Sequence, residues 1–380
     1  MSSLAVLQLL ERGESLTPAL IDDFLAVNGS PVAEGGSVTF FWRGEAEQVR
    51  LRHFVFGLPT AQRFTRLEGT DLWYLSFEVP RGSRFEYKIE VLRGGRRTLL
   101  RDPLNPKIAR DPFGANSVCH TLGYETPEWT YPDPDARPGT LETVDVPSAL
   151  HGRPQPVTLY RPARFKSSRR YRVLVVFDGD DYVRFAGLKT VLDNLIHRYE
   201  IPPLVVALSQ SPDRMADYSA NPAHAAWVTD QLLPFLEAKL PLRQRAADRG
   251  LLGASLGAVA ALRVASARPG MFGGLLLQSG SFAFSDYGEG AEDPRMEPVL
   301  SFVNELRARP SRVAEKVFLT CGIYEALIYH NRSLVPRLQE AGMDVRFVEA
   351  RDGHNWENWR DRLREGLTWL LPGPIGFVYD

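Results

Sequence analysis

The sequence predicts two domains, a small all-β sandwich followed by an α/β domain with a doubly wound, mostly parallel sheet. Three observations support this prediction. A chain of 380 residues is long for a single hydrophobic core. Between residues 37 and 91 the apolar positions alternate with period two, which is typical of half-buried strands. After residue 140, nearly continuous apolar runs alternate with helical stretches, as expected for strands buried on both faces.

The front of the chain is predicted to contain a helical segment and then the sandwich. Residues 1–30 are predicted to contain a small amphipathic helix at residues 1–12 and then a second helix, which begins at the cap Thr17 and first-turn Pro18. The sandwich, assigned to residues 31–135, has alternating strands at 37–42, 49–55, 72–79 and 84–91. Their aromatic side chains could bind a ligand, but the period of two favours a core. A stretch rich in Pro and Asp, residues 127–139, marks the seam between the domains.

The α/β domain is assigned to residues 140–380. Its helices are expected at 186–199 and 225–240, and its strands at 157–160, 172–177, 204–208, 274–277, 316–321 and 344–349. The composition excludes several partners. A net charge of -1 gives no reason to expect nucleic acid or a membrane surface as a partner, and no apolar run is long enough to cross a bilayer. Two distant cysteines imply no disulfide framework, and the N-terminus lacks a signal peptide pattern. We therefore expect a cytoplasmic protein, and the sequence leaves its oligomeric state open.

The segment around Ser255 carries the strongest chemical signal. A short apolar strand precedes Gly253-Ala254-Ser255-Leu256-Gly257, and an Ala-rich helix follows. Such a strand–turn–helix exposes a nucleophilic serine on a strained elbow, and the two glycines remove side chains where the backbone is crowded. Serine is a weak nucleophile, so it needs a base, an orienting acid and an oxyanion hole. We expect the N–H of Leu256 to supply one oxyanion donor, and that of Gly179 or Asp180 the other.

The expected base is His354, which follows the last strand on a loop that opens a helix. The other late histidine, His330, lies within a predicted helix. The expected acid is Glu325, on the loop after the preceding strand; Asp352 is its rival, and a dyad without an acid also remains open. The carboxylates of residues 178–181 could instead bind calcium, but their spacing is not that of an EF-hand loop. We expect no metal and no organic cofactor.

Seven segments of the second half, in this order, resemble the esterase D-like α/β-hydrolases and in particular the enterochelin (ferric enterobactin) esterases. They are Phe177-Asp178-Gly179, Asp213–Tyr218, Leu232–Pro234, Gly253–Gly257, Gln278–Phe282, Gly322–Glu325 and Asp352–Arg360. In the front half, Asp102–Pro106 and the aromatic strands resemble that family's early-set immunoglobulin-like domain. The resemblance implies an α/β-hydrolase fold and the hydrolysis of ester bonds in a tricatechol siderophore, with release of iron after uptake.

The resemblance also implies that Arg214 contacts an anionic substrate, although a structural salt bridge is equally compatible with the sequence. Tyr182, Phe282 and Trp356 are expected at the substrate as well. The chain departs from the family where Phe282-Ala283-Phe284 stands in place of tryptophans and at the elbow residues Ala254 and Ala258. These departures concern the pocket more than the chemistry, so ester hydrolysis is a firmer expectation than catechol specificity.

The sequence therefore predicts a serine ester hydrolase acting on a small-molecule ester, such as a ferric catechol siderophore. Two alternatives stay open. One is a carbohydrate-related esterase of feruloyl or acetyl-xylan type with a carbohydrate-binding front domain. The other is a non-catalytic binding protein on a hydrolase fold.

Overall fold

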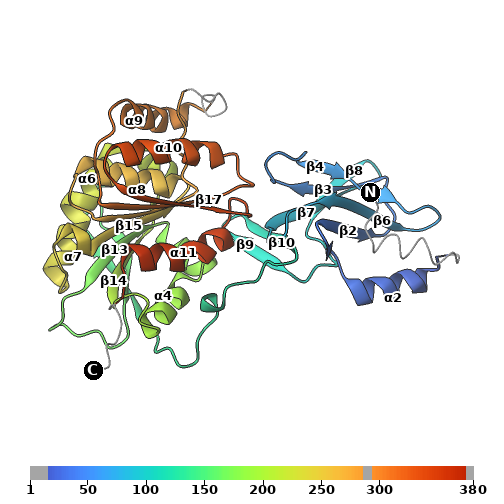
Figure 1. Ribbon diagram of the computed structural model, residues 1–380, viewed down its shortest axis with the longest axis horizontal. Helices are drawn as coiled ribbons and strands as arrows, with labels where there is room; N and C mark the ends of the chain where they lie inside the picture. The colour runs from blue at the N-terminus through green and yellow to red at the C-terminus, as the bar shows by residue number, and fades with distance from the viewer. Residues whose placement is uncertain (1–15, 286–292, 374–380) are drawn as a thin grey trace. The chain divides into compact units, whose positions relative to one another are not determined.

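The structure is a computed structural model that describes residues 16–285 and 293–373. The chain forms two compact units (Figure 1). Of the described residues, the smaller unit contains those up to Thr126 together with two short loops of the second half, Gly322–Ala326 and Arg351–Asn355, and the larger unit contains the others. The division falls after Thr126, within a few residues of the predicted Pro-rich seam. The small amphipathic helix predicted at residues 1–12 lies outside the described residues.

The smaller unit opens with the helix that the sequence predicts, α2 (Pro18–Asn28). The side chain of Thr17 accepts a hydrogen bond from the N–H of Leu20 at 3.3 Å, as an N-cap does. Ile21 and Phe24 are buried against one sheet of the sandwich, and the ring of Phe24 meets that of Phe41 edge-on at 5.4 Å.

Two antiparallel sheets form the predicted sandwich. One has the strand order β1-β2-β6-β5, and the other β4-β3-β7-β10-β9 with β8 paired to β7. The strands are β1 (Val32–Glu34), β2 (Ser37–Arg43), β3 (Gln48–His53), β4 (Ala61–Arg63), β5 (Thr65–Arg66), β6 (Leu72–Glu78), β7 (Arg84–Arg93), β8 (Arg96–Leu100), β9 (Ile108–Asp111) and β10 (Gly114–His120). Their inward aromatic residues form the core, since Phe40 and Tyr87 are buried with ring centroids 4.8 Å apart.

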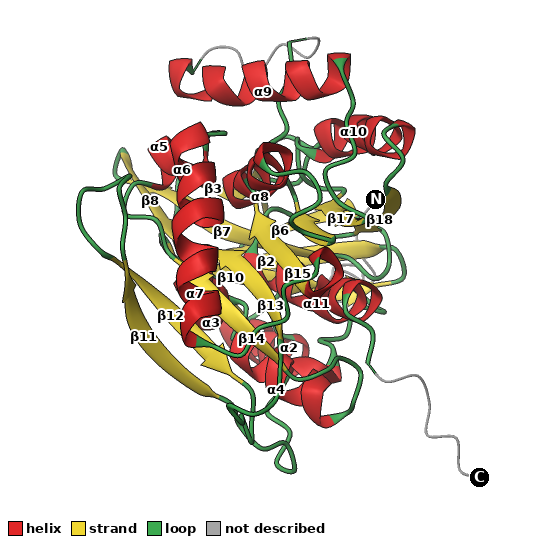
Figure 2. Cartoon of the chain, turned by 90° about the vertical axis from the view of Figure 1, so that its left-hand side faces the viewer, coloured by secondary structure: helices red, strands yellow, loops and turns green. Residues whose placement is uncertain are grey.

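The larger unit contains one eight-stranded sheet of order β11-β12-β14-β13-β15-β16-β17-β18. Its strands are β11 (Thr140–Val146), β12 (Gln155–Arg161), β13 (Arg172–Phe177), β14 (Leu204–Ser209), β15 (Arg249–Ala254), β16 (Gly274–Gln278), β17 (Lys316–Gly322) and β18 (Asp344–Ala350). β11 and β12 make an antiparallel edge (Figure 2), while β13 to β17 pair in parallel. The predicted mostly parallel, doubly wound sheet is confirmed.

Helices cover both faces of this sheet (Figures 1 and 2). Their bounds are η1 (Glu128–Thr130), α3 (Gly179–Phe185), α4 (Leu188–His197), α5 (Arg214–Tyr218), α6 (Pro222–Trp227), η2 (Val228–Leu232), α7 (Leu233–Lys239), η3 (Ala246–Asp248), α8 (Leu256–Ala267), η4 (Pro294–Met296), α9 (Glu297–Ala308), α10 (Ile328–Glu340) and α11 (Trp356–Leu370). The single helix predicted at 225–240 is divided by the π-helical turn η2 just before Pro234, whose ring nitrogen cannot donate the helical hydrogen bond.

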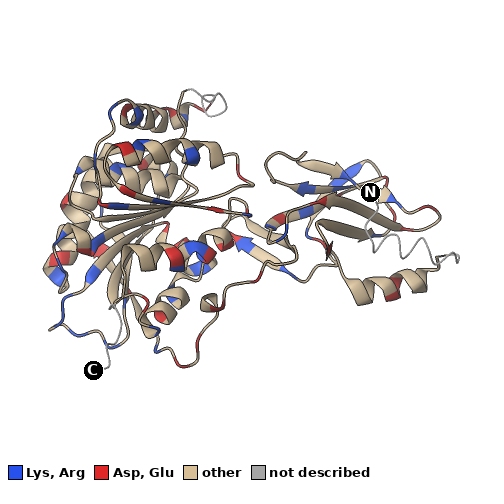
Figure 3. Ribbon diagram, viewed as in Figure 1, with Lys and Arg blue, Asp and Glu red and all other residues tan. Residues whose placement is uncertain are grey.

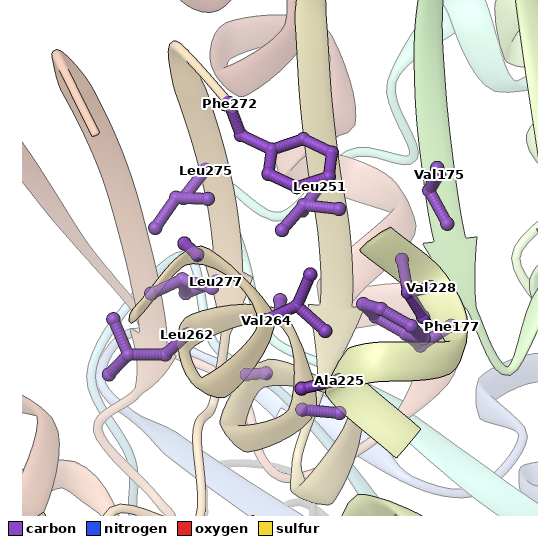
Figure 4. Packing of buried hydrophobic residues seen from close by; sticks show 14 of the residues in the cluster. Val175, Phe177, Ala225, Val228, Leu251, Leu262, Val264, Phe272, Leu275 and Leu277 are labelled. Atoms are coloured by element: carbon purple, nitrogen blue, oxygen red, sulfur yellow. The ribbon is translucent and has the colours of Figure 1, made fainter. Parts of the chain in front are cut away.

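Two buried clusters, one on each face, fix the sheet between its helices. On the face of α6, α8, α9 and α10, Leu251, Leu275 and Leu277 of the strands pack against helical residues such as Leu262 and Val228 (Figure 4). Residues of α3, α4 and α11 form the cluster on the opposite face. Lys and Arg residues alternate with Asp and Glu residues along the ribbons of both units (Figure 3), in keeping with the net charge of -1. Within residues 16–285 and 293–373, no helix is long and apolar enough to span a membrane.

The strand order of the larger unit indicates where a catalytic site can form. β13 is followed in the chain by β14 on one side, and β15 returns to pair with β13 on the other. The connections leave the neighbouring strands β13 and β15 in opposite directions, and in open α/β sheets ligands bind outside the carboxyl ends of the strands at such a point. The segment after β13 begins at Asp178, and the segment after β15 begins at Ser255.

Candidate active site

Ser255 occupies the strained turn between β15 and α8 that the sequence predicts. Its backbone has φ 57 and ψ -122, a combination that costs a non-glycine residue free energy and needs support from its surroundings. Gly253 permits this turn, because a Cβ there would lie 2.2 Å from the carbonyl oxygen of Gly257. Further support comes from backbone bonds: the N–H of Ser255 donates to Gln278 at 2.9 Å, and its carbonyl accepts from Ser281 at 3.2 Å.

The segment after β16 lies directly beside this serine. The two hydroxyl oxygens of Ser255 and Ser281 are 3.2 Å apart. Asn331 fixes the segment by holding both backbone groups of Gly280, accepting from its N–H at 3.1 Å and donating to its carbonyl at 2.9 Å. Ser281 had no predicted role, although it lies in Gln278–Phe282, one of the segments that carry the family resemblance.

The loop after β13 presents the predicted second oxyanion segment. Asp178 has the left-handed φ of 55, and α3 begins at Gly179. A side chain at Gly179 is excluded, because its Cβ would lie 2.5 Å from the backbone of Leu208. Leu256 is the first residue of α8, so its N–H is among the helix N-terminal donors without an intrahelical acceptor. Gly179, Asp180 and Leu256 thus all lie in the first turns of helices that follow neighbouring strands, and their role as oxyanion donors stays a prediction.

The carboxylate of Asp178 is buried at the base of this loop and is paired with Arg214. The Nε of Arg214 lies 2.9 Å from each carboxylate oxygen, and its Nη2 donates to the carbonyl of Ala254 at 3.3 Å. Burial raises the pKa of Asp178, and the guanidinium partly opposes that rise. Arg214 therefore forms the structural ion pair that the sequence left open, next to the elbow, while 39% of its side chain is exposed.

Glu325 and His354 are paired in the smaller unit. The Nδ1 of His354 is 2.7 Å from Oε2 of Glu325, and the other carboxylate oxygen accepts the N–H of Gly322 at 2.7 Å. The Glu325 side chain is 1% exposed and the imidazole 39% exposed. Asp352, the rival acid, accepts from Arg84 at 3.1 Å and from Asn355 at 2.8 Å. Glu325 is therefore the carboxylate in contact with Nδ1 of His354.

Comparisons with known proteins show the family of the chain. The family model described as "Putative esterase" matches residues 148–370. This chain belongs to that esterase family. The model of the enterochelin esterase N-terminal domain matches residues 37–129 of the esterase. The predicted family resemblance is therefore confirmed for both halves, and the protein is a carboxylic ester hydrolase.

Individual relatives match over nearly the whole esterase. The iron(III) enterobactin esterase of Escherichia coli K12 is 26% identical over 87% of this chain and 90% of its own length. The iron(III) salmochelin esterase of Escherichia coli O6:H1 is 28% identical, covering 88% and 87% of the two chains. The enterobactin esterase of Shigella flexneri, crystallised in the presence of enterobactin, superposes with a TM-score of 0.73 at 21% identity over 93% of this chain and 98% of that one. This last likeness shows the fold.

Three residues expected at the substrate lie instead in the core of the esterase. Tyr182 and Phe282 are fully buried, and Trp356 is 8% exposed. Tyr182 donates to the side-chain oxygen of Gln278 at 2.7 Å, and Trp356 packs edge-on against its ring at 5.2 Å. These rings therefore belong to the two core clusters of the larger unit, which leaves Arg214 as the partly exposed member of the expected set. Aromatic character alone does not distinguish a ring that lines a pocket from one that fills a core.

No group of three or more His, Cys, Asp or Glu side chains is placed to hold a metal ion among residues 16–285 and 293–373. The carboxylates of residues 178–181 have other partners, since Asp178 pairs with Arg214 and Asp180 accepts from Thr158 at 3.4 Å.

Proposed function

We propose that this esterase hydrolyses ester bonds by acyl transfer through Ser255, His354 and Glu325. The observation that carries the proposal is the 2.7 Å contact between His354 and Glu325 on two loops that follow successive strands, in a chain whose elbow exposes a serine. A carboxylate on Nδ1 keeps that proton in place and leaves Nε2 as the nitrogen that accepts the serine proton.

The proposed reaction has two steps. Ser255 Oγ forms a bond to the ester carbonyl carbon while its proton passes to Nε2 of His354, and the carbonyl oxygen becomes an oxyanion held by N–H groups of Leu256 and of Gly179 or Asp180. The tetrahedral intermediate collapses, the alcohol leaves with the proton from His354, and an acyl-serine remains. Water then attacks the acyl-serine with the same proton transfers, releasing the acid and restoring the serine.

The proposed substrate is a catechol siderophore of the trilactone type, including its ferric complex. The match of residues 37–129 to the enterochelin esterase N-terminal model supports this class over a carbohydrate ester. The named relatives, esterases of enterobactin and salmochelin, match across both halves of the chain. We further propose that Arg214 contacts the anionic substrate with the exposed part of its guanidinium.

We also propose that the reaction takes place in the cytoplasm. Cys119 and Cys321 are both buried and are not joined in a disulfide, which suits a reducing compartment.

A direct test compares wild-type protein with Ser255→Ala on an enterobactin-type trilactone and on a feruloylated sugar. We expect kcat/KM to be higher for the trilactone and turnover of both to fall to background in the variant. Retained turnover in the variant would exclude Ser255, and a preference for the sugar would favour the carbohydrate esterase alternative. Labelling with a fluorophosphonate separates both from a non-catalytic protein, in which the serine would not react.

A further inference from the structure

The two loops that carry Glu325 and His354 are bonded by their backbones to the β-sandwich. The N–H of Phe56, just after β3, donates to the carbonyl of Tyr324 at 2.9 Å, and the N–H of Arg84 donates to the carbonyl of Arg351 at 2.9 Å. A third bond, from the N–H of Tyr324 to the carbonyl of Asp352 at 3.1 Å, joins the two loops to each other. Backbone hydrogen bonds therefore join residues near the candidate acid and base to the sandwich.

Arg84, the first residue of β7, is the centre of this connection. Its side chain is 2% exposed, which is rare for arginine and requires its charge to be paired. The guanidinium donates to Oδ1 of Asp352 at 3.1 Å and to Oδ1 of Asn355 at 2.8 Å. These two residues lie on either side of His354 in the chain, two positions before it and one position after it. One planar group thus fixes both ends of the short segment that carries the imidazole.

The segment is also closed by its own hydrogen bonds. Oδ1 of Asp352 accepts from the N–H of Gly353 at 2.7 Å and from the side-chain amide of Asn355 at 2.8 Å. Beside Arg84, the Ser83 hydroxyl lies 2.5 Å from the hydroxyl of Tyr324, the residue that precedes Glu325. The sandwich therefore contacts the acid loop through Ser83 and the base loop through Arg84.

A role in stability alone explains this arrangement poorly. Burying an ion pair removes two charges from water, and well-packed apolar residues often stabilise a fold equally well. A guanidinium that holds two specific acceptors gives orientation instead, and Nη1 of Arg84 donates to both Asp352 and Asn355. Orientation matters for His354, since 39% of its side chain is exposed and a displacement of about 1 Å in a catalytic group can cost roughly 100-fold in rate.

We propose that Arg84 of the β-sandwich is a positioning residue for His354: by holding Asp352 and Asn355, it sets the segment so that the bond between His354 and Glu325 exists before substrate arrives. This inference rests on the proposed function, in which His354 is the base. It gives the front domain a part in the chemical step as well as any part in binding. The sandwich then acts on the rate constant, through a side chain that need not touch substrate.

The test uses the full chain with Arg84→Met, which keeps the length of the side chain and removes the fork, and Arg84→Lys, which keeps the charge. Arg110→Met, at an exposed arginine of β9 in the same sheet, is the matched control. With a p-nitrophenyl ester we expect kcat to fall about 10- to 100-fold in Arg84→Met with KM within about threefold of wild type. The rate of fluorophosphonate labelling should fall by the same factor. Arg84→Lys should recover part of kcat, and the control should match wild type.

A spectroscopic measurement distinguishes positioning from general destabilisation. In protein labelled with ¹⁵N-histidine, the Nδ1 resonance of His354 should shift or broaden in Arg84→Met while the resonance of the buried His224 in α6 stays in place. If Arg84→Met fails to fold, Asn355→Ala removes one of the two acceptors and should lower kcat about three- to tenfold at unchanged KM.

The outcomes separate the two proposals. An inactive Ser255→Ala together with wild-type kcat in Arg84→Met, or in Asn355→Ala where Arg84→Met does not fold, would overturn the positioning role and leave the proposed function intact. Turnover retained in Ser255→Ala would overturn the proposed function itself. An unshifted His354 resonance alongside a lowered kcat would also contradict positioning through the base.

Discussion

The nucleophile and its candidate partners are supported in different ways. Ser255 is fixed locally, by a backbone turn that depends on the neighbouring Gly253 and on one adjacent strand. The pair of Glu325 and His354 is fixed by side chains remote in sequence, as the separation of 268 positions between Arg84 and Asp352 illustrates. A nucleophile on a strained backbone needs little from other domains, whereas an exposed imidazole depends on whatever holds its loop. The two regions therefore tolerate different substitutions.

The largest expected effect tests whether Ser255 and the pair of Glu325 and His354 depend on each other in catalysis. Ser255→Ala and His354→Ala should each lower kcat by about 10⁴- to 10⁶-fold, because neither group performs acyl transfer without the other. The double variant should be no slower than the slower single variant. Steady-state kinetics with an activated ester measure all three. Losses that multiply in the double variant would show two independent contributions and would break the proposed triad.

The second test changes the acid–base region alone. Glu325→Gln keeps the size of the side chain and removes the charge that stabilises a protonated imidazole. We expect kcat/KM to fall about 10²- to 10⁴-fold. Glu340→Gln, at an exposed glutamate of α10, is the control and should retain wild-type activity. Equal activity of the two variants in the same ester assay would contradict the orienting role of Glu325. It would favour Asp352 as the acid, or a dyad without an acid.

The third test changes the elbow alone. In Gly253→Ala the new Cβ would lie 2.2 Å from a backbone oxygen, so strand and helix must separate. We expect a loss of about 3 kcal/mol or more in the free energy of unfolding. Gly36→Ala in the sandwich meets nothing within 4 Å and should change stability by less than about 0.5 kcal/mol. Urea unfolding measures both, and a tolerated Gly253→Ala would show that the turn is less constrained than its contacts imply.

The smallest expected effect compares the acid sensitivity of the two units. Burial lowers the pKa of His53 in the sandwich to about 4 and that of His224 in α6 to about 3. An unfolded histidine binds a proton below about pH 6.5, so the unfolded state gains protons first and stability falls as the pH drops from there. The contribution of His53 should be lost by about pH 4, and that of His224 by about pH 3.

Urea midpoints measured between pH 7.5 and 4 check this sign. His53→Asn should make stability depend less on pH in that range, and His197→Asn, at an exposed position in α4, is measured beside it for comparison. A midpoint that rises on acidification would contradict the buried, neutral state of both histidines.

Much of the fold follows from the sequence, because short-range patterns encode it. Period-two alternation predicted the sandwich, and the apolar runs predicted β13 to β17 within a residue or two at most ends. The elbow was equally accessible, since Gly253 and Gly257 lie beside the serine that they accommodate. Order along the chain pointed to Glu325 and His354, which the structure pairs directly.

Other features of the site could not be read from the sequence. An isolated arginine at the start of a strand carries no sign that its partners lie near the opposite end of the chain, so Arg84 was missed. Tyr182 and Phe282 were predicted to lie at the substrate but are buried in the core. A ring in the core and a ring at a pocket have the same local sequence pattern. Long-range contacts of single side chains depend on the packed tertiary structure. Sequence periodicity indicates only which face of a helix or strand is buried.

The long separation between Arg84 and its loop has a consequence for biosynthesis. At about 5 to 20 residues per second, the ribosome needs roughly 10 to 50 s to reach Asp352 after it has made Arg84. Glu86, whose Oε1 lies 3.2 Å from Nη2 of Arg84 in the finished protein, is made at almost the same time as the arginine. Asp352 and Asn355, the partners of Arg84 on the loop of His354, are added only at the end of that interval.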